Sequence, residues 1–243
     1  MRPYSTRATL GFAALATLSL AAGCRRSEAT PARESAHANV ATAPSAATGA
    51  PGAAGALTDS VSTAADKGRI RGTQGIWVIE VSDFQCPYCK RWHDESFAKL
   101  EKEYVQTGKV RMAYLNFPLS MHANARAAAE AAMCASVQDK FWPMHESLFA
   151  TQEAWAAQRD PSRTFDSLAV AAGVNAAAWR SCVSSHATAA LIDADRERST
   201  RAGVESTPTF FIGSDRKLEG AYPVDTFRVA INAALAKARA TTK

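Results

Sequence analysis

The chain has 243 residues, of which 47% are hydrophobic and 21% are charged, and its formal net charge is +5 at pH 7. No basic cluster interleaved with aromatic residues is present, which argues against a nucleic-acid-binding protein. The composition is that of an ordinary globular protein, and the length allows one well-buried domain.

The N-terminus has the pattern of an export signal. Arg2 and Arg7 precede an apolar stretch from Leu10 to Ala22 that ends in small residues. This stretch is too short for a membrane-spanning helix of about 20 residues, so we expect a signal peptide over residues 1–23. Export implies an oxidising compartment outside the cytoplasm, where disulfides persist.

The end of this signal, Leu20–Cys24, resembles a bacterial lipobox, whose cysteine receives a lipid and becomes the mature N-terminus. Ala21 stands where the motif usually has leucine, and ordinary signal cleavage is the alternative. Removing Cys24 to an anchor leaves four cysteines, enough for two pairs. We therefore expect lipid attachment at Cys24 and a periplasmic or other extracytoplasmic envelope location.

Residues 24–66 consist mainly of Ala, Pro, Gly, Ser and Thr and contain hardly any large apolar side chain. Such a segment cannot bury enough apolar surface to offset the entropy lost on ordering. We predict a disordered tether here, followed by a single folded domain over residues 67–243.

The folded part begins with a strand–helix–strand pattern. The run Ile76–Val81 is apolar except at Glu80, as in a central strand that is buried on both faces of a parallel sheet. A helix is predicted from Pro87 to about Gln106, and a second strand over 110–117. Together they form a right-handed βαβ unit.

Two cysteines stand at the start of the predicted helix, in the sequence Cys86-Pro87-Tyr88-Cys89. Unpaired backbone N–H groups and the positive end of the helix dipole stabilise a thiolate there and lower the pKa of the leading cysteine. Pro87 suits the first helical position, where its missing N–H costs nothing. Cys86 is the candidate nucleophile and Cys89 its resolving partner.

The alternative for this motif is half of a structural zinc site, which needs a second Cys-X-X-Cys or a Cys/His pair at ligand spacing. The other cysteines and the histidines are scattered instead: Cys24, Cys134, Cys182, His37, His93, His122, His145 and His186. We expect no metal site and no cofactor.

After Pro118 the apolar periodicity becomes helical, with helices predicted over 122–136, 140–149, 165–172 and, with breaks, 175–201. A hairpin over 209–219 and a closing helix over 225–237 follow. Within the helical part, Cys134 and Cys182 are a possible structural disulfide, which the even cysteine count favours. The alternative is two buried free thiols, which pack as small apolar residues.

Four segments resemble one family, the thioredoxin-fold disulfide oxidoreductases of the bacterial envelope, in their DsbA-like branch. These segments, in the family's order, are residues 80–89 (EVSDFQCPYC), 116–119 (NFPL), 140–145 (KFWPMH) and 203–211 (GVESTPTFF). Ser206 departs from the glycine that is common before the Thr-Pro pair. The resemblance implies an α/β protein, a thioredoxin fold with an α-helical subdomain inserted at about 119–202.

The resemblance also implies roles for several residues. Thr207 and Pro208 match the family's cis-proline loop, which packs against the active-site helix and pairs with the substrate backbone; the alternative is an ordinary trans proline. With Pro87 and Tyr88 they form the active-site loop. Glu80 matches a buried acid whose pKa is raised by desolvation and which accepts the proton of Cys89. The alternative is a glutamate that reaches solvent at the sheet edge.

Other conspicuous side chains receive no catalytic role. His93 is expected to face solvent beside Arg91 and Asp94, whereas Trp142 and His145 are expected in the core of the inserted helices.

The function predicted from these features is thiol–disulfide exchange on exported proteins, with Cys86 and Cys89 introducing disulfides as an oxidase. The implied partners are reduced or unfolded exported polypeptides, a membrane redox partner (a quinone-linked oxidase or an electron donor) and the membrane through the lipid anchor, with no nucleic acid. A monomer is expected, because family isomerases carry a folded N-terminal dimerisation domain, and the low-complexity tether predicted here is not such a domain. The alternatives are an envelope isomerase or reductase, and a non-catalytic thioredoxin-fold binding module.

Overall fold

The computed structural model describes residues 53–241 of the chain. The predicted signal peptide over residues 1–23 and the predicted lipid attachment at Cys24 lie outside these residues, as does the larger part of the predicted tether. Among the helices of residues 53–241, none is both long enough and apolar enough to cross a membrane.

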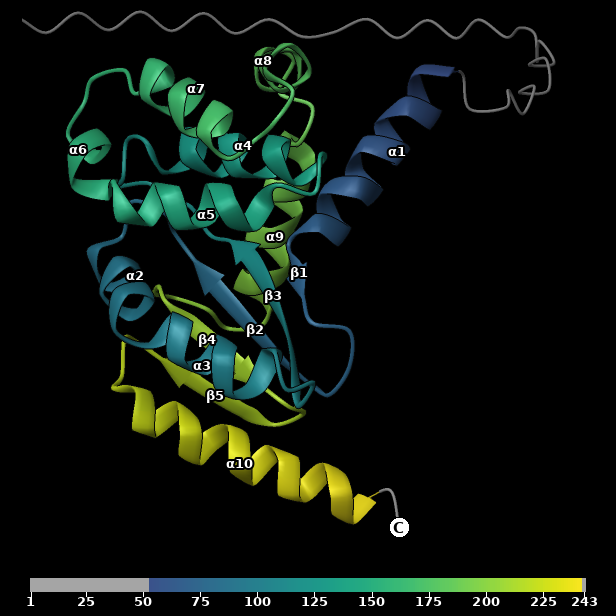
Figure 1. Ribbon diagram of the computed structural model, residues 1–243, viewed down its shortest axis with the longest axis vertical. Coiled ribbons are helices and arrows are strands. Elements are labelled where there is room, and N and C mark those ends of the chain that lie inside the picture. The colour runs from purple at the N-terminus through teal and green to yellow at the C-terminus, as the bar shows by residue number, and fades with distance from the viewer. Residues whose placement is uncertain (1–52, 242–243) are drawn as a thin grey trace, which may run out of the picture. The chain divides into compact units, whose positions relative to one another are not determined.

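A five-stranded sheet forms the centre of the described fold (Figure 1). Its strands are β1 (Ile70–Arg71), β2 (Ile76–Ser82), β3 (Val110–Asn116), β4 (Thr209–Ile212) and β5 (Arg216–Glu219), in the order β1-β3-β2-β4-β5. β2 pairs in parallel with β3 and antiparallel with β4. The prediction of a central β2 is therefore confirmed, and so is the β4–β5 hairpin. The two-residue β1, which pairs with β3, was not predicted.

The active-site helix and the last helix cover one face of this sheet. The former runs without a break through α2 (Pro87–Trp92), η1 (His93–Phe97), α3 (Ala98–Leu100) and η2 (Glu101–Val105), where η1 and η2 are π-helical turns. The last helix is α10 (Val224–Thr241). Trp92 of α2, Phe210 of β4 and Phe227 of α10 contact one another through their rings. This aromatic group fixes the active-site helix on the sheet.

Six helices lie between β3 and β4 in the sequence. They are α4 (Ala125–Ser136), α5 (Phe141–Ala150), α6 (Gln152–Ala156), α7 (Ser162–Ala171), α8 (Ala176–Ser184) and α9 (Ala189–Arg201). α4, α5 and α7 were predicted within a few residues, α8 and α9 were predicted together as one stretch with breaks, and α6 was not predicted. Helices α4 to α8 gather beyond the end of the sheet toward which β2 and β3 point, and α9 contacts β3 (Figure 1). The carboxyl end of β2 therefore meets the helical insertion.

The prediction of disorder up to residue 66 is wrong for its last part, because α1 spans Ala53–Gly68. Alanine is the best helix former, and tertiary contacts anchor this helix. Ala65 is fully buried, and its carbonyl accepts a 2.6 Å hydrogen bond from Ser136 of α4. A side chain at Gly68 would collide with the backbone of Ser136, so glycine permits the close approach of α1 and α4. Arg69 then forms a buried ion pair with Asp195 of α9.

Candidate functional site

The two thiols of the Cys-X-X-Cys motif lie at the first turn of α2. Cys86 is the N-cap residue and Pro87 occupies the first helical position, as predicted. Cys86 is 3% exposed and Cys89 is fully buried. The two are not bonded to each other, so the structure represents the reduced pair.

The pKa values of the two thiols move in opposite directions. The pKa of Cys86 is lowered from 9.0 to about 6, first by a hydrogen bond from the Cys89 thiol, with further contributions from Thr207 and from the backbone N–H groups of Cys89 and Tyr88. The pKa of Cys89 is raised well above 9.0, first by desolvation and then by the neighbouring Cys86. Near pH 7, Cys86 is therefore a thiolate and Cys89 a thiol.

The loop before β4 lies against Cys86. The Thr207–Pro208 peptide bond is cis, and Cys86 Sγ lies 3.5 Å from the Thr207 carbonyl oxygen. The Pro208 carbonyl accepts a 2.7 Å hydrogen bond from the N–H of Gly220, just after β5. The structure thus brings together the two segments of the active-site loop, which are 121 residues apart in sequence.

Tyr88 is the exposed member of the motif. Its side chain is 58% exposed, with the Arg91 guanidinium 5.1 Å from its ring centroid. An exposed aromatic ring beside a reactive sulfur offers apolar contact area to a bound polypeptide.

Glu80 lies in the central strand, buried beneath the thiols. It is fully buried, pairs across the parallel ladder with Tyr114, and neither carboxyl oxygen has a hydrogen-bond partner of good geometry. Desolvation raises its pKa from 4.5 to about 8. Among the described residues, no ion pair includes Glu80, so its buried carboxyl group is neutral near pH 7.

Residues beside the cysteines fasten the active-site turn, and sequence reasoning gave them no role. Buried Asp83 accepts hydrogen bonds from the N–H groups of Gln85 (2.7 Å) and Leu119 (2.9 Å), and its carboxylate pairs with His122 Nδ1 at 2.7 Å. Gln152 of α6 donates from Nε2 to the carbonyl oxygens of Phe84 (2.7 Å) and Cys86 (3.1 Å). The helical insertion therefore holds the backbone of Cys86 directly.

His93 does not face solvent as predicted. Its ring stacks on Phe97 and Phe149 and lies 5.2 Å, centroid to centroid, from His145 of α5. His145 is fully buried, as expected, and desolvation lowers its pKa well below 6.5. The sequence predicted that His93 lies on the active-site helix, but it did not predict that α5 packs against this helix. The contact with α5 determines the burial of His93.

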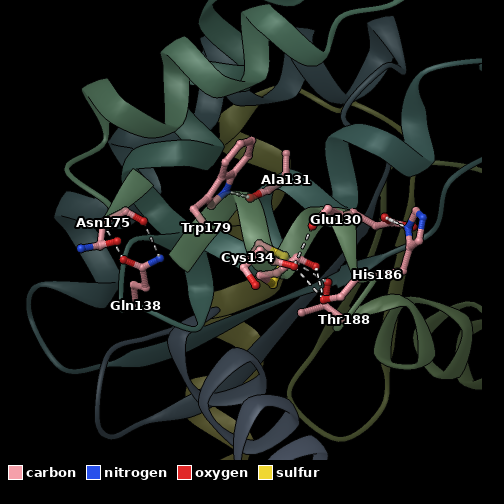
Figure 2. Close-up of a disulfide and its surroundings, with 12 residues drawn as sticks. Glu130, Ala131, Cys134, Gln138, Asn175, Trp179, His186 and Thr188 are labelled. Atoms are coloured by element: carbon pink, nitrogen blue, oxygen red, sulfur yellow. Dashed lines mark hydrogen bonds and ion pairs between the residues drawn. A yellow bond between two sulfur atoms is a disulfide. The ribbon is translucent and has the colours of Figure 1, made fainter. Parts of the chain in front are cut away.

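A disulfide joins the second cysteine pair, Cys134 of α4 and Cys182 of α8, with a Cα–Cα distance of 5.8 Å. Figure 2 shows its surroundings, where Trp179 Nε1 donates a 3.0 Å hydrogen bond to the Ala131 carbonyl and Thr188 lies beside Cys134. The bridge ties two helices of the insertion together and is separate from the reactive thiols. Within the described residues, no group of three or more His, Cys, Asp or Glu side chains could hold a metal ion.

Comparison with known proteins finds a matching family model and several proteins of similar sequence. A family model described as Thioredoxin matches residues 76–233, more than half of the chain. The Na(+)/H(+) antiporter NhaA 3 of Salinispora tropica is 31% identical over 179 residues, which cover 72% of this chain and 26% of the antiporter. Disulfide bond formation protein D of Bacillus subtilis is 22% identical over 142 residues, covering 56% of this chain and 63% of that protein.

Solved structures share the fold. The crystal structure of oxidised BdbD from Bacillus subtilis matches with a TM-score of 0.63 and 22% identity, covering 70% of this chain and 94% of that one. The chain spans about a quarter of the length of the antiporter and less than two thirds of the length of disulfide bond formation protein D.

Proposed function

The chain belongs to the thioredoxin family, with the DsbA-like form of its fold, and we propose that it catalyses thiol–disulfide exchange and introduces disulfides into other polypeptides. Cys86 is the nucleophile and Cys89 the resolving thiol. The observation that carries this proposal is the opposite displacement of the two thiol pKa values, to about 6 for Cys86 and well above 9.0 for Cys89. The Cys86 sulfur is thereby a good leaving group, and the Cys89 sulfur holds its proton.

The reaction proceeds through a mixed disulfide. A substrate thiolate attacks Cys86 of the oxidised pair, the Cys86–Cys89 bond breaks, and Cys89 leaves as a thiolate that takes up a proton. A second substrate thiolate then attacks the substrate sulfur of the mixed disulfide, and Cys86 leaves as its stable thiolate. The substrate is oxidised by two electrons and the enzyme pair is reduced. Because the low pKa of Cys86 stabilises the reduced pair, oxidation of the substrate is the favoured direction.

Glu80 exchanges a proton with Cys89 in this scheme. A group with a pKa of about 8 gives up and regains a proton readily near neutral pH. The Thr207–Pro208 loop borders the Cys86 sulfur, where the mixed disulfide forms, and is the proposed contact for the substrate backbone.

The proposed substrates are reduced, exported polypeptides, and re-oxidation of the pair requires a membrane redox partner. The support for this location is in the sequence, where a signal peptide over residues 1–23 and a lipid-accepting Cys24 would hold the enzyme at the extracytoplasmic side of a membrane. The redox partner and a monomeric state are what the resemblance to the DsbA-like family implies.

Disulfide transfer to a reduced peptide with two cysteines tests the function. The oxidised full-length protein should convert the peptide to its cyclic disulfide form, measured by alkylation and mass spectrometry. Cys86→Ser and Cys89→Ser should each abolish the transfer, because neither variant can form the Cys86–Cys89 disulfide that oxidises the peptide. The Cys134→Ser/Cys182→Ser variant is the matched control and should retain transfer. Equal activity of wild type and Cys86→Ser would instead mean a non-catalytic binding module.

A further inference from the structure

A cluster of buried polar atoms lies beneath the two thiols, on the face of the sheet that α2 covers. Glu80 and Ser82 are two residues apart in β2, so their side chains point to the same face. Tyr114 is the ladder partner of Glu80 in β3, and its side chain lies on this face too. The register of β2 and β3 thus brings three proton-carrying groups to one face of the sheet. Cys89 of α2 is fully buried and lies close enough to Ser82 for the hydroxyl to affect its pKa.

Ser82 is the member of this cluster with no role so far. It is 1% exposed, and its hydroxyl has no hydrogen-bond partner of good geometry, like the Glu80 carboxyl and the Tyr114 hydroxyl. The hydroxyl nevertheless lies close enough to Glu80, Cys89 and Tyr114 to offset part of the rise that desolvation causes in the pKa of each. A buried polar group without a partner is costly, and such costs are found where function requires the group.

We propose that the Ser82 hydroxyl is the proton relay between Glu80 and Cys89, an inference that rests on the proposed thiol–disulfide exchange. A serine hydroxyl donates one proton and accepts another at the same oxygen, which a relay requires. Its χ1 rotation turns the hydroxyl from one neighbour to the other. Hydrogen bonds used in catalysis are often long in the resting enzyme and tighten during the reaction.

The relay balances in both directions. When a substrate thiolate attacks Cys86, the Cys89 sulfur leaves with the bonding electron pair and takes the Ser82 hydroxyl proton, while the Ser82 oxygen takes the proton of the Glu80 carboxyl. The net result is a neutral Cys89 thiol and an ionised Glu80, which regains its proton from solvent. When Cys89 attacks a mixed disulfide on Cys86, the same protons move in the opposite direction.

Few other titratable groups face this site in the described structure. Asp83 follows Ser82 in the chain, and its charge contributes to raising the pKa of Tyr114. His145 of α5 lies beyond the Tyr114 ring, 5.3 Å away between centroids. β4 contributes apolar Phe210 opposite Glu80. Ser82 therefore carries a hydroxyl that lies close to both the acid and the resolving thiol.

The test isolates the attack of Cys89. Glutathione is placed on Cys86 of the reduced full-length protein at acid pH, using the mixed disulfide of glutathione and thiopyridine. A jump to higher pH then starts the attack, and glutathione release is followed by rapid quenching and mass analysis. In the wild type, release should accelerate as the pH rises through about 8, where Glu80 becomes the ionised base.

Ser82→Ala should slow release at neutral pH by about tenfold or more, because proton transfer by positioned groups contributes at least that much. It should also move the midpoint of the pH profile upward, since the hydroxyl that lowers the Glu80 pKa is gone. Ser82→Thr keeps a hydroxyl and should restore both the rate and the midpoint. Ser96→Ala, which removes another buried and unpartnered hydroxyl of the same helix–sheet core, should change neither.

An unchanged rate and midpoint in Ser82→Ala overturns the relay. The relay is also overturned if Ser82→Ala and Ser82→Thr slow glutathione release equally while the midpoint of the pH profile stays at its wild-type value, because that pattern indicates a packing defect. If the wild type itself never releases glutathione, the failure lies in the proposed exchange reaction and not in the relay.

Discussion

Replacement of Glu80 by glutamine should stabilise the fold in a pH-dependent way. Burial raises the pKa of Glu80 from 4.5 to about 8, so the folded protein holds a proton that the unfolded chain releases. A group with a raised pKa in the folded state contributes its full stability below pH 4.5 and loses it as the pH rises toward 8. Each pH unit in this window costs about 1.4 kcal/mol, so the deficit reaches about 3 kcal/mol at pH 7.

Glutamine is neutral at every pH and has nearly the same shape. The free energies of unfolding of wild type and Glu80→Gln should therefore be similar near about pH 4 and differ by about 3 kcal/mol near pH 7, with the variant more stable. Guanidinium unfolding of the reduced proteins at the two pH values measures this difference. Glu153→Gln, at an exposed position of α6, is the matched control and should show no such divergence.

The same substitution should slow the reaction of Cys89 by about a hundredfold, because general acid–base groups contribute on that scale. A variant that is more stable and less active separates a catalytic carboxyl from a structural one. The reasoning is refuted if the stability difference does not depend on pH, since the Glu80 carboxyl would then be hydrated or paired in the folded protein.

Other regions of the fold give further testable changes. Replacing Cys134 and Cys182 together by serine opens a loop with a sequence separation of 48 residues, which should cost up to about 4 kcal/mol in denaturant unfolding; a cost near zero would contradict a bridge under native conditions. The pKa of His145 is lowered by burial, so its contribution to stability is present above about pH 6.5 and lost as the pH falls below that value. In His145→Phe, the free energy of unfolding should therefore fall less steeply as the pH decreases below about 6.5. An unchanged fall would mean that other groups cause the loss of stability in acid. Arg69→Met leaves the buried Asp195 carboxylate with Arg198 as its remaining ion-pair partner and should destabilise the protein by up to about 3 kcal/mol; full stability would show that α1 does not depend on the Arg69–Asp195 pair.

Local sequence pattern predicted the elements that carry the chemistry. The apolar run around Glu80 identified a central strand, and the Cys-Pro-Tyr-Cys sequence after it placed the Cys86/Cys89 pair at a helix start, because these features depend on neighbours along the chain. The burial of Glu80 followed from the same run.

Features set by contacts between distant segments were not predictable in this way. Helix α1 has much the same composition as residues 24–52, which precede it in the sequence. It is anchored by Arg69, which pairs with Asp195, 126 residues away. The burial of His93 depends on α5 packing against the active-site helix. Ser82 gains significance only through the register that sets β2 beside β3 and under Cys89. A single sequence does not specify these pairings.

The reduction potential of the Cys86/Cys89 pair tests the central claim most directly. Lowering the pKa of Cys86 to about 6 makes the reduced form about tenfold more favourable at pH 7, which raises the potential by about 30 mV before any other contribution. Equilibration of the full-length protein with glutathione buffers, with each cysteine assigned by alkylation and mass mapping, should give a value between about −240 and −120 mV. A value of about −270 mV or lower would contradict the oxidase direction and identify a reductase.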